Sequence, residues 1–216
     1  QSRGLRVRRL AGAAGGFVRL SPATGRGDLR RDLDAVWGAA LAAVDPAVLV
    51  RRSLTDSGEG DGEGHDAVGP DVLVAAVGKA ARGMVRGAFE ALGPRIRGAV
   101  VVAPRGPSED DLPDPSRIRI IHAGHPFPDE GSMAGARAAL DLVGSAGPAD
   151  RIVFLLSGGA SALLTLPPEG VSLSDVALTS RLLMEAGADI AELNTVRKHL
   201  DRVKGGQLAR AAARSE

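Results

Sequence analysis

The stretch LLSGGASALL, residues 155–164, places a pair of glycines between two serines directly after an apolar run. Gly158 and Gly159 can adopt positive φ and let a ligand approach the main chain. Successive N–H groups in such a loop can form an anion-binding nest, and the hydroxyls of Ser157 and Ser161 add polar groups to it. A purely structural turn would use the same residues. The segment lacks the G-x-S-x-G pattern of a nucleophilic serine.

Lysine is rare in this chain, and one lysine follows an apolar run. Of the 27 basic residues only three are lysines, and Lys79 stands directly after residues 71–78. An ammonium at the start of the expected helix 79–92 would converge with backbone N–H groups on a bound anion. The alternative is an ordinary surface lysine. The segment matches neither the Walker A loop nor the dinucleotide pattern G-x-G-x-x-G.

Charged residues also gather in ELNTVRKHLDRVKGGQLA, residues 192–209. Helical spacing places four polar residues on one arc beside an apolar stripe: Asn194, Arg197, Asp201 and Lys204. Lys198 points elsewhere on such a helix. Gly205 and Gly206 each cost about 1 kcal/mol relative to alanine inside a helix, and a close backbone or ligand contact would account for them. A solvated polar flank is the alternative.

The segment HAGHPFPDEGS, residues 122–132, leads from an expected strand into an expected helix. Asp129 is suited to the N-cap of that helix. His122 and His125 could contact a ligand, but two histidines without a third ligand do not make a metal site. With no cysteine in the chain, disulfides and zinc–thiolate sites are excluded. We therefore expect no metal held by protein side chains.

Short apolar runs that alternate with helical patterns position these segments. Expected strands cover 71–78, 98–104, 117–124 and 151–159, and expected helices cover 28–44, 79–92, 129–143, 172–187 and 189–213. This alternation predicts an α/β fold with a doubly wound, mainly parallel sheet and helices on both faces. Ligands of such sheets bind beyond the carboxyl ends of the strands, where the glycine pair and Lys79 are expected.

Composition limits the function classes. The net charge of +1, the 2% aromatic content and the lack of tyrosine give no support for nucleic-acid binding, and no apolar run is long enough for a membrane helix. Residues 1–27 are expected to be a disordered basic tail and 28–216 an incomplete α/β domain with a flexible acidic loop at 53–70. We expect a cytoplasmic protein. The arginine-rich, acid-poor start also allows a mitochondrial transit peptide.

Four segments, in this order, resemble the type II glycerate kinase family: VGKAARGM, HAGHPFPDEGS, LLSGGASALLTLPPEGVSLSD and ADIAELNTVRKHLDRVKGGQLA. The resemblance extends over roughly residues 30–213. It implies a Rossmann-like N-terminal domain, followed in the family by a smaller MOFRL domain, with the active site in the cleft between them. Members transfer the γ-phosphoryl group of ATP to D-glycerate, so ATP and Mg²⁺ are the implied cofactors.

The resemblance also implies roles for individual residues. Lys79 would act in phosphoryl transfer. The residues implied for substrate or phosphate binding are Ser157, Gly158, Gly159, Ser161, Asn194, Arg197, Lys198 and Lys204. Ala160 departs from the family pattern, which has a third glycine there. Because the family continues well beyond Glu216, we expect this chain to be inactive alone and to associate, for instance as a homodimer.

Two other functions are compatible with the sequence. One is an NAD(P)H-dependent hydroxypyruvate reductase, a label that this family has sometimes carried, although the absence of G-x-G-x-x-G argues against it. The other is a non-catalytic, anion-binding remnant of a kinase. Titration with D-glycerate, ATP and NADH separates the kinase from the reductase.

Overall fold

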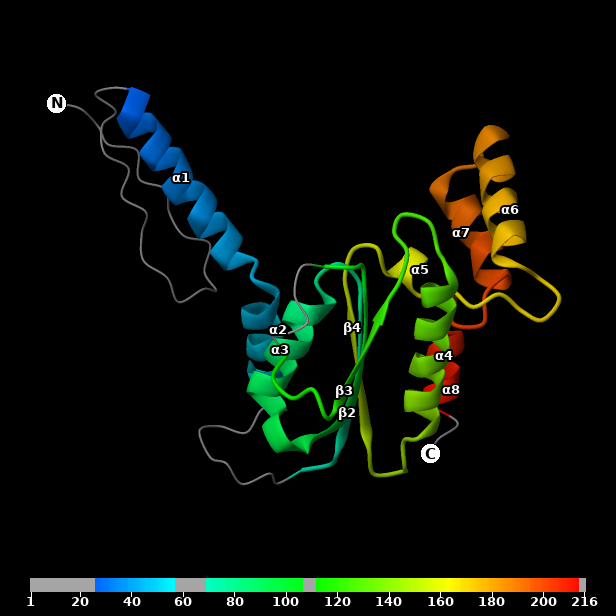
Figure 1. Cartoon of the computed structure of the whole chain (residues 1–216), viewed down its shortest axis with the longest axis horizontal. Helices are drawn as coiled ribbons and strands as arrows, with labels where there is room; N and C mark the ends of the chain where they lie inside the picture. Colours follow the sequence, from blue (N-terminus) through cyan, green and yellow to red (C-terminus); the bar gives the residue numbers. More distant parts are fainter. Residues whose placement is uncertain (1–25, 57–68, 107–111, 214–216) are drawn as a thin grey trace.

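The computed structural model describes residues 26–56, 69–106 and 112–213 (Figure 1). Nearly all of the expected basic tail 1–27, and residues 57–68 of the expected acidic loop 53–70, lie outside these ranges. The predictions for those two segments therefore stay predictions.

A four-stranded parallel sheet forms the centre of the molecule. Its strands are β1 (Val72–Val77), β2 (Ile96–Ala103), β3 (Ile118–His122) and β4 (Arg151–Leu156), in the order β3-β2-β1-β4. All six residues of β1 are buried, as expected for a strand that has a neighbour on each side and helices on both faces. Val72 of β1 pairs with Ile96 of β2 and with Arg151 of β4. The predicted parallel sheet is confirmed.

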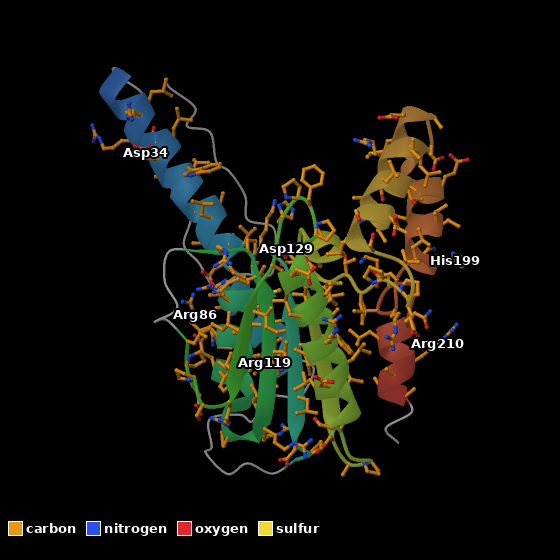
Figure 2. All side chains as sticks on the ribbon, turned by 45° about the vertical axis from the view of Figure 1, so that its right-hand side comes forward. Asp34, Arg86, Arg119, Asp129, His199 and Arg210 are labelled. Atoms are coloured by element: carbon orange, nitrogen blue, oxygen red, sulfur yellow. The ribbon has the colours of Figure 1, made fainter. Side chains whose placement is uncertain are left out.

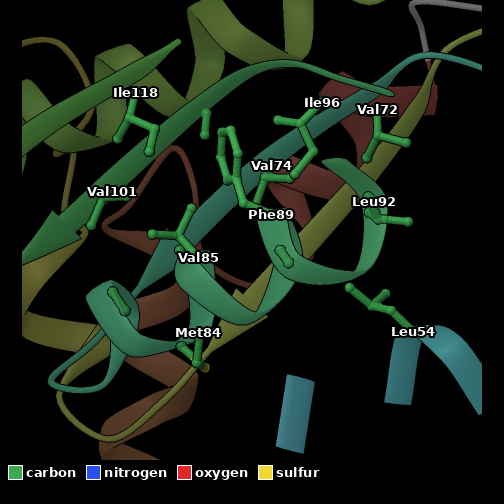
Figure 3. Close-up of a cluster of buried hydrophobic side chains, with 14 of the residues drawn as sticks. Leu54, Val72, Val74, Met84, Val85, Phe89, Leu92, Ile96, Val101 and Ile118 are labelled. Carbon is green, nitrogen blue, oxygen red and sulfur yellow. The ribbon is translucent and has the colours of Figure 1, made fainter. Parts of the chain in front are cut away.

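Helices cover both faces of the sheet (Figure 1). One face carries α2 (Pro46–Asp56) and α3 (Ala81–Leu92), and Figure 3 shows the cluster on this side, where Val85 and Phe89 of α3 pack among Val74 and Val101 of the sheet. The other face carries α4 (Glu130–Gly144) and α8 (Gln207–Ala213), whose small residues pack against strand residues such as Val100 and Val102. The doubly wound α/β architecture predicted from the sequence is thus present.

The remaining helices lie around this core. They are α1 (Arg26–Ala43), the 3₁₀ turn η1 (Gly93–Arg95), the single turn α5 (Ala160–Leu163), α6 (Leu173–Glu185) and α7 (Ile190–His199). In Figure 1, α1 extends away from the core on one side, and α6 and α7 stand together on the other. Large apolar side chains of α1 are exposed, among them Leu33 and Trp37.

Two helix predictions need correction. The first helix ends before Asp45-Pro46 as expected, but the helix α2 that follows was not expected, and its last residues fall in the segment 53–70 that was expected to be a loop. Asp45 instead caps a new helix, because its Oδ1 accepts hydrogen bonds from the backbone N–H groups of Ala47 and Val48, and proline is suited to the first helical position.

The second correction concerns the single helix expected over 189–213. The structure divides it into α7 and α8, because Gly205 and Gly206 have φ of +60° and +85°, which a right-handed helix cannot accommodate. Asp201 stabilises the break by accepting hydrogen bonds from the backbone N–H groups of Val203 and Lys204. Asn194, Arg197, Asp201 and Lys204 were predicted to share one face of a single helix. Because α7 ends at His199, Asp201 and Lys204 lie in the turn after it, and this prediction is wrong.

Among the described residues, no single helix is both long and apolar enough to cross a membrane. Leu29–Ala43 and Pro46–Asp56 would pass by length and composition only as a pair, and they meet at a bend of 43°.

Candidate functional site

The strand order reverses at the carboxyl end of β1. The chain runs outward from β1 to β2 and β3, and then returns to place β4 on the other side of β1. Ligands of open parallel sheets bind at such a reversal, because the loops that follow the two strands diverge there. Lys79 follows β1 and residues 157–159 follow β4, so the two segments with the clearest chemical signals meet at this point.

The two loops are joined by hydrogen bonds. The backbone N–H of Lys79 donates to Gly158 O at 2.9 Å, and that of Ala80 donates to Ser157 Oγ at 3.1 Å. Ser157 Oγ in turn donates to Val77 O at 3.4 Å. Gly78 has φ of +126°, and a Cβ at this position would overlap Ser157 Oγ, so only glycine permits this approach. The hydroxyl of Ser157, predicted to bind substrate, is engaged with the protein.

The two glycines of the loop differ from each other. Gly159 has φ of +92° and precedes α5, whereas Gly158 does not have positive φ and is exposed with open space where a side chain would stand. The expectation of positive φ is therefore right for Gly159 and wrong for Gly158. Within the described ranges, neither backbone N–H has a hydrogen-bond acceptor in the protein. Both can donate to a bound anion.

Lys79 and His125 flank Gly159. A Cβ on Gly159 would stand 3.5 Å from Lys79 Cγ and 2.8 Å from His125 Cδ2. Lys79 is exposed and lies in the turn before α3, which begins at Ala81 rather than at Lys79 as expected. His125 comes from the loop after β3 and precedes a cis peptide bond to Pro126. Three loops at the carboxyl edge of the sheet thus bring the side-chain stem of Lys79 and the imidazole of His125 to Gly159.

Arg197 connects α7 to the glycine loop. Its Nη2 donates to Ser161 Oγ at 3.0 Å, so a residue of the charged segment 192–209 does reach the loop. Lys204 lies deeper: its Nζ donates to Leu164 O and Thr165 Oγ1 at 2.8 Å, and to Asp201 Oδ2. Burial lowers the pKa of Lys204, and the neighbouring Asp201 carboxylate raises it in part.

A cleft of about 790 Å³ opens beside these residues. Its polar lining residues are Thr165, Ser174, Ser180, Arg181, Arg197, Asp201 and Lys204. Its other walls are largely apolar and come from the loop after β3 and from α6 and α7: Pro126, Phe127, Pro128, Val176, Leu178, Met184 and Leu193. A cleft of this size, apolar with a few polar groups, is typical of small-molecule sites.

Of the predicted site residues, only Arg197 and Lys204 line this cleft. Lys79 and the loop residues Ser157, Gly158, Gly159 and Ser161 do not line it. Asn194 and Lys198 are exposed on α7 and do not line it. The aliphatic part of Lys198 is near Gly205, whose Cβ, if present, would stand 3.2 Å from Lys198 Cβ. The structure therefore brings Arg197 and Lys204 to the cleft, leaves Asn194 and Lys198 on the surface of α7, and places the glycine loop and Lys79 outside the cleft lining.

Asp129 fixes the loop that carries His125. Its Oδ1 accepts hydrogen bonds from Gly124 N at 2.8 Å and from Ser132 N at 3.0 Å, which forms the predicted N-cap of α4 (Figure 2). Partial burial raises the pKa of Asp129, but these hydrogen bonds lower it more, and the net result is a pKa below the ordinary value of 3.8.

Three residues of the candidate site were not among those predicted from the sequence. His125 was considered as a ligand contact but not selected, and Asp201 was placed only on a helical arc. Thr165 gave no signal, because its role depends on a lysine 39 residues away. Across the described ranges, no group of three or more histidine, aspartate or glutamate side chains could hold a metal ion.

A parallel sheet with a glycine loop at its switch point defines a Rossmann-like α/β protein. The family model that matches residues 32–216 is described as "Domain of unknown function (DUF4147)". The chain belongs to this family, the N-terminal domain of the type II glycerate kinases.

Named relatives support this assignment. A D-glycerate 2-kinase from Thermotoga maritima is 48% identical over 138 residues, which cover 64% of this chain and 32% of the relative. A putative hydroxypyruvate reductase from Agrobacterium vitis is 36% identical over 183 residues, covering 85% of this chain and 39% of the relative. The crystal structure of the Thermotoga maritima glycerate kinase matches with a TM-score of 0.71 at 37% identity, over 86% of this chain and 42% of that one. The chain thus spans less than half the length of these relatives.

Proposed function

We propose that this chain forms one wall of the active site of a glycerate kinase, an enzyme that transfers the γ-phosphoryl group of ATP to a hydroxyl of D-glycerate. The observation that carries the proposal is the meeting of the loops after β1 and β4, where the stem of Lys79 lies against Gly159 and the Lys79 N–H donates to Gly158 O. Phosphoryl transfer needs mainly positioned positive charge and hydrogen-bond donors, which these two loops supply.

Lys79 is the proposed catalytic residue. Its flexible stem lies against Gly159, and its exposed ammonium can follow the phosphoryl group as negative charge moves during transfer. The N–H groups of Gly158 and Gly159 would hold phosphate oxygens in place. Because these donors are fixed by the hydrogen bonds between the two loops, they do not need to reorganise as the reaction proceeds.

The charged face of α7 is proposed to bind the remaining anionic groups. Arg197 and Ser161 are already hydrogen-bonded to each other at the mouth of the loop, and a guanidinium keeps further N–H donors for a carboxylate or phosphate. Asn194 and Lys198 would contribute only at the outer surface, and Ser157 only through the shape of the loop.

ATP and Mg²⁺ are the proposed cofactors. The donors of these two loops suit nucleotide phosphates. Since the described residues offer no cluster of metal-ligating side chains, this wall would hold Mg²⁺ through phosphate oxygens rather than through carboxylates of its own. When bound, the ion neutralises phosphate charge, while Lys79 and the two glycine N–H groups orient the transferred group.

A hydroxypyruvate reductase is the second candidate, because one relative carries that name. A dinucleotide site would normally place G-x-G-x-x-G after β1, and this chain has VGKAARGM there. The proposal for the whole protein therefore favours the kinase. We propose in addition that the protein is cytoplasmic, that it binds D-glycerate and that it forms a homodimer.

Isothermal titration of the purified chain with ATP, D-glycerate and NADH tests the proposal. We expect heat of binding with ATP or D-glycerate, lost in a Lys79→Ala, Arg197→Ala double variant and retained in the surface control Arg210→Ala. Binding of NADH in preference to ATP would support the reductase. Binding of inorganic phosphate alone, with no response to ATP or D-glycerate, would identify a non-catalytic anion site.

A further inference from the structure

The ammonium of Lys204 has its full set of hydrogen-bond partners inside the protein. It donates to Leu164 O, Thr165 Oγ1 and Asp201 Oδ2, and its side chain is only 15% exposed. A lysine has three N–H donors. All three are therefore directed at protein acceptors, which leaves none for a ligand in the cleft.

The carboxylate of Asp201 is also fully engaged. It is 4% exposed, and besides Lys204 Nζ it accepts hydrogen bonds from the backbone N–H groups of Val203 at 2.9 Å and Leu166 at 3.4 Å. A backbone hydrogen bond from Arg202 N to Leu166 O, at 2.8 Å, lies beside it. The turn between α7 and α8 is thus attached to residues 164–166, directly after α5.

Thr165 extends this attachment to the glycine loop. Its hydroxyl accepts from Lys204 Nζ and donates its own hydrogen to Ser161 O at 3.1 Å. On the other side, Arg197 of α7 donates to Ser161 Oγ. Ser161 is therefore held at its carbonyl through Thr165 and Lys204, and at its hydroxyl through Arg197.

We propose that Lys204 and Asp201 are a positioning pair: they fix the turn after α7 against α5, so that Arg197 meets Ser161 at the mouth of the glycine loop, and they do not contact substrate. This inference rests on the proposed anion site at that loop. It gives Lys204 a different task from the ligand contact that the family resemblance implies.

The low lysine content makes a direct test practicable. With only Lys79, Lys198 and Lys204 in the chain, an NMR spectrum that selects lysine side-chain ¹⁵Nζ contains three signals. We expect Lys204 to give a slowly exchanging ammonium signal, because its hydrogens are bonded and shielded from water. On titration with ATP and with D-glycerate, the Lys79 signal should move and that of Lys204 should not. A Lys204 signal that exchanges as fast as that of Lys198, or shifts as much as that of Lys79, overturns the proposal.

Variants test the positioning itself without any ligand. Amide hydrogen exchange at Thr165, a residue 2% exposed whose N–H donates to Ser132 O, should quicken at least tenfold in Lys204→Met and in Asp201→Asn. Arg202→Met serves as the control, because Arg202 is an exposed side chain in the same turn. Unchanged exchange at Thr165 in a folded Lys204→Met protein contradicts the proposal.

A double-mutant cycle then connects the pair to binding. Lys204→Met should weaken ATP or D-glycerate binding about as much as Arg197→Ala does, and the double variant should be no weaker than either. Additive losses would mean that Lys204 acts independently of Arg197, and would overturn the proposal. If the unmodified chain binds neither ligand, the proposed function fails, and the lysine spectrum and hydrogen exchange still decide the role of the pair.

Discussion

Neighbouring glycines in the loop after β4 have different tasks. Gly159 has positive φ and packs against His125 and Lys79, whereas Gly158 is open to solvent with ordinary φ. Glycine at position 159 is a backbone requirement, and glycine at position 158 leaves space and an accessible N–H for a ligand. Substitutions at these two positions should therefore separate folding from binding.

Gly159→Ala should lower the free energy of unfolding by about 1–3 kcal/mol, because an L-residue at φ of +92° is strained and its Cβ would press on the His125 ring. Gly158→Ala should stay within about 0.5 kcal/mol of the parent protein. Urea denaturation of both variants measures this difference. Equal stabilities would contradict the assigned backbone conformations.

Lys79→Ala tests the proposed catalytic group. In a longer protein that carries the rest of the family's active site, we expect turnover to fall by about 10²–10³, which corresponds to a loss of roughly 3–4 kcal/mol in transition-state stabilisation. Because Lys79 is exposed, the unfolding temperature should barely change. A coupled kinase assay provides the readout, and an equally active Lys79→Ala enzyme would exclude this role.

The sequence predicted which segments come together at the candidate site, but it did not predict which side-chain atoms contact one another there. Lys79, Gly159, Ser161 and Arg197 do meet, because motif residues at the ends of parallel strands share one edge of the sheet. The partners of Lys204 could not be predicted, since they depend on where α7 ends and on how the following turn packs against α5. Periodicity along one helix carries no information about either.

At the scale of secondary-structure elements, the cap of α4 connects helix stability with loop position. Asp129 closes a capping box with Ser132 and also accepts from Gly124 N, in the loop that precedes His125. The strands and α4 were predictable, because their apolar runs and their cap are local signals. The extent of α2 and the division between α7 and α8 were not, because a capping proline and a glycine pair each allow two interpretations.

Asp129→Ala should destabilise the protein by about 1 kcal/mol at pH 7, as expected for loss of an N-cap. The pKa of Asp129 is lowered in the folded state, so its carboxylate stabilises the fold above pH 3.8, and this contribution is lost as pH falls further below that value. The difference between the parent protein and Asp129→Ala, measured by urea denaturation, should therefore shrink in acid.

Asp129→Asn is the matched control for this prediction, because an amide oxygen still accepts the capping hydrogen bonds but does not titrate in this range. Its stability should lie close to that of the parent protein at pH 7. A parent-to-Ala difference that stays constant down to pH 2 would show that the charge of Asp129 has no part in the cap.

At the scale of the whole molecule, an edge strand and an exposed helix face can each attract another copy of the chain. One is the outer edge of β4, where Leu156 is 65% exposed, and the other is the apolar side of α1, where Trp37 is 66% exposed. An uncovered strand edge and an exposed apolar helix face both favour association.

We therefore expect residues 1–216 to associate in a concentration-dependent manner, which sedimentation velocity measures. Trp37→Glu should weaken the association if it proceeds through α1, and Leu156→Lys, at an exposed residue of β4, should weaken it if it proceeds through the edge of β4. A monomer at all concentrations would contradict the expectation that these surfaces attract one another.

The same molecule should show no measurable ATP-dependent phosphorylation of D-glycerate. The loops after β1 and β4 offer one wall of a site, and in-line transfer needs both reactants held within about 3–3.5 Å of each other. The matched relatives are more than twice as long as the part that this chain covers. A coupled assay on the purified chain checks this, and normal turnover by a monomer would mean that the site is complete within these residues.

The strand order also has a consequence for synthesis on the ribosome. β1 can pair with β2 soon after both have emerged, but its other neighbour, β4, becomes available only when residue 156 has left the exit tunnel. Until then Gly78 has no Ser157 to approach, and the turn that carries Lys79 lacks its hydrogen bond to Gly158. A nascent chain released before β4 would therefore expose the unpaired edge of its central strand, and the loop contacts on which the proposed anion site depends would not yet exist.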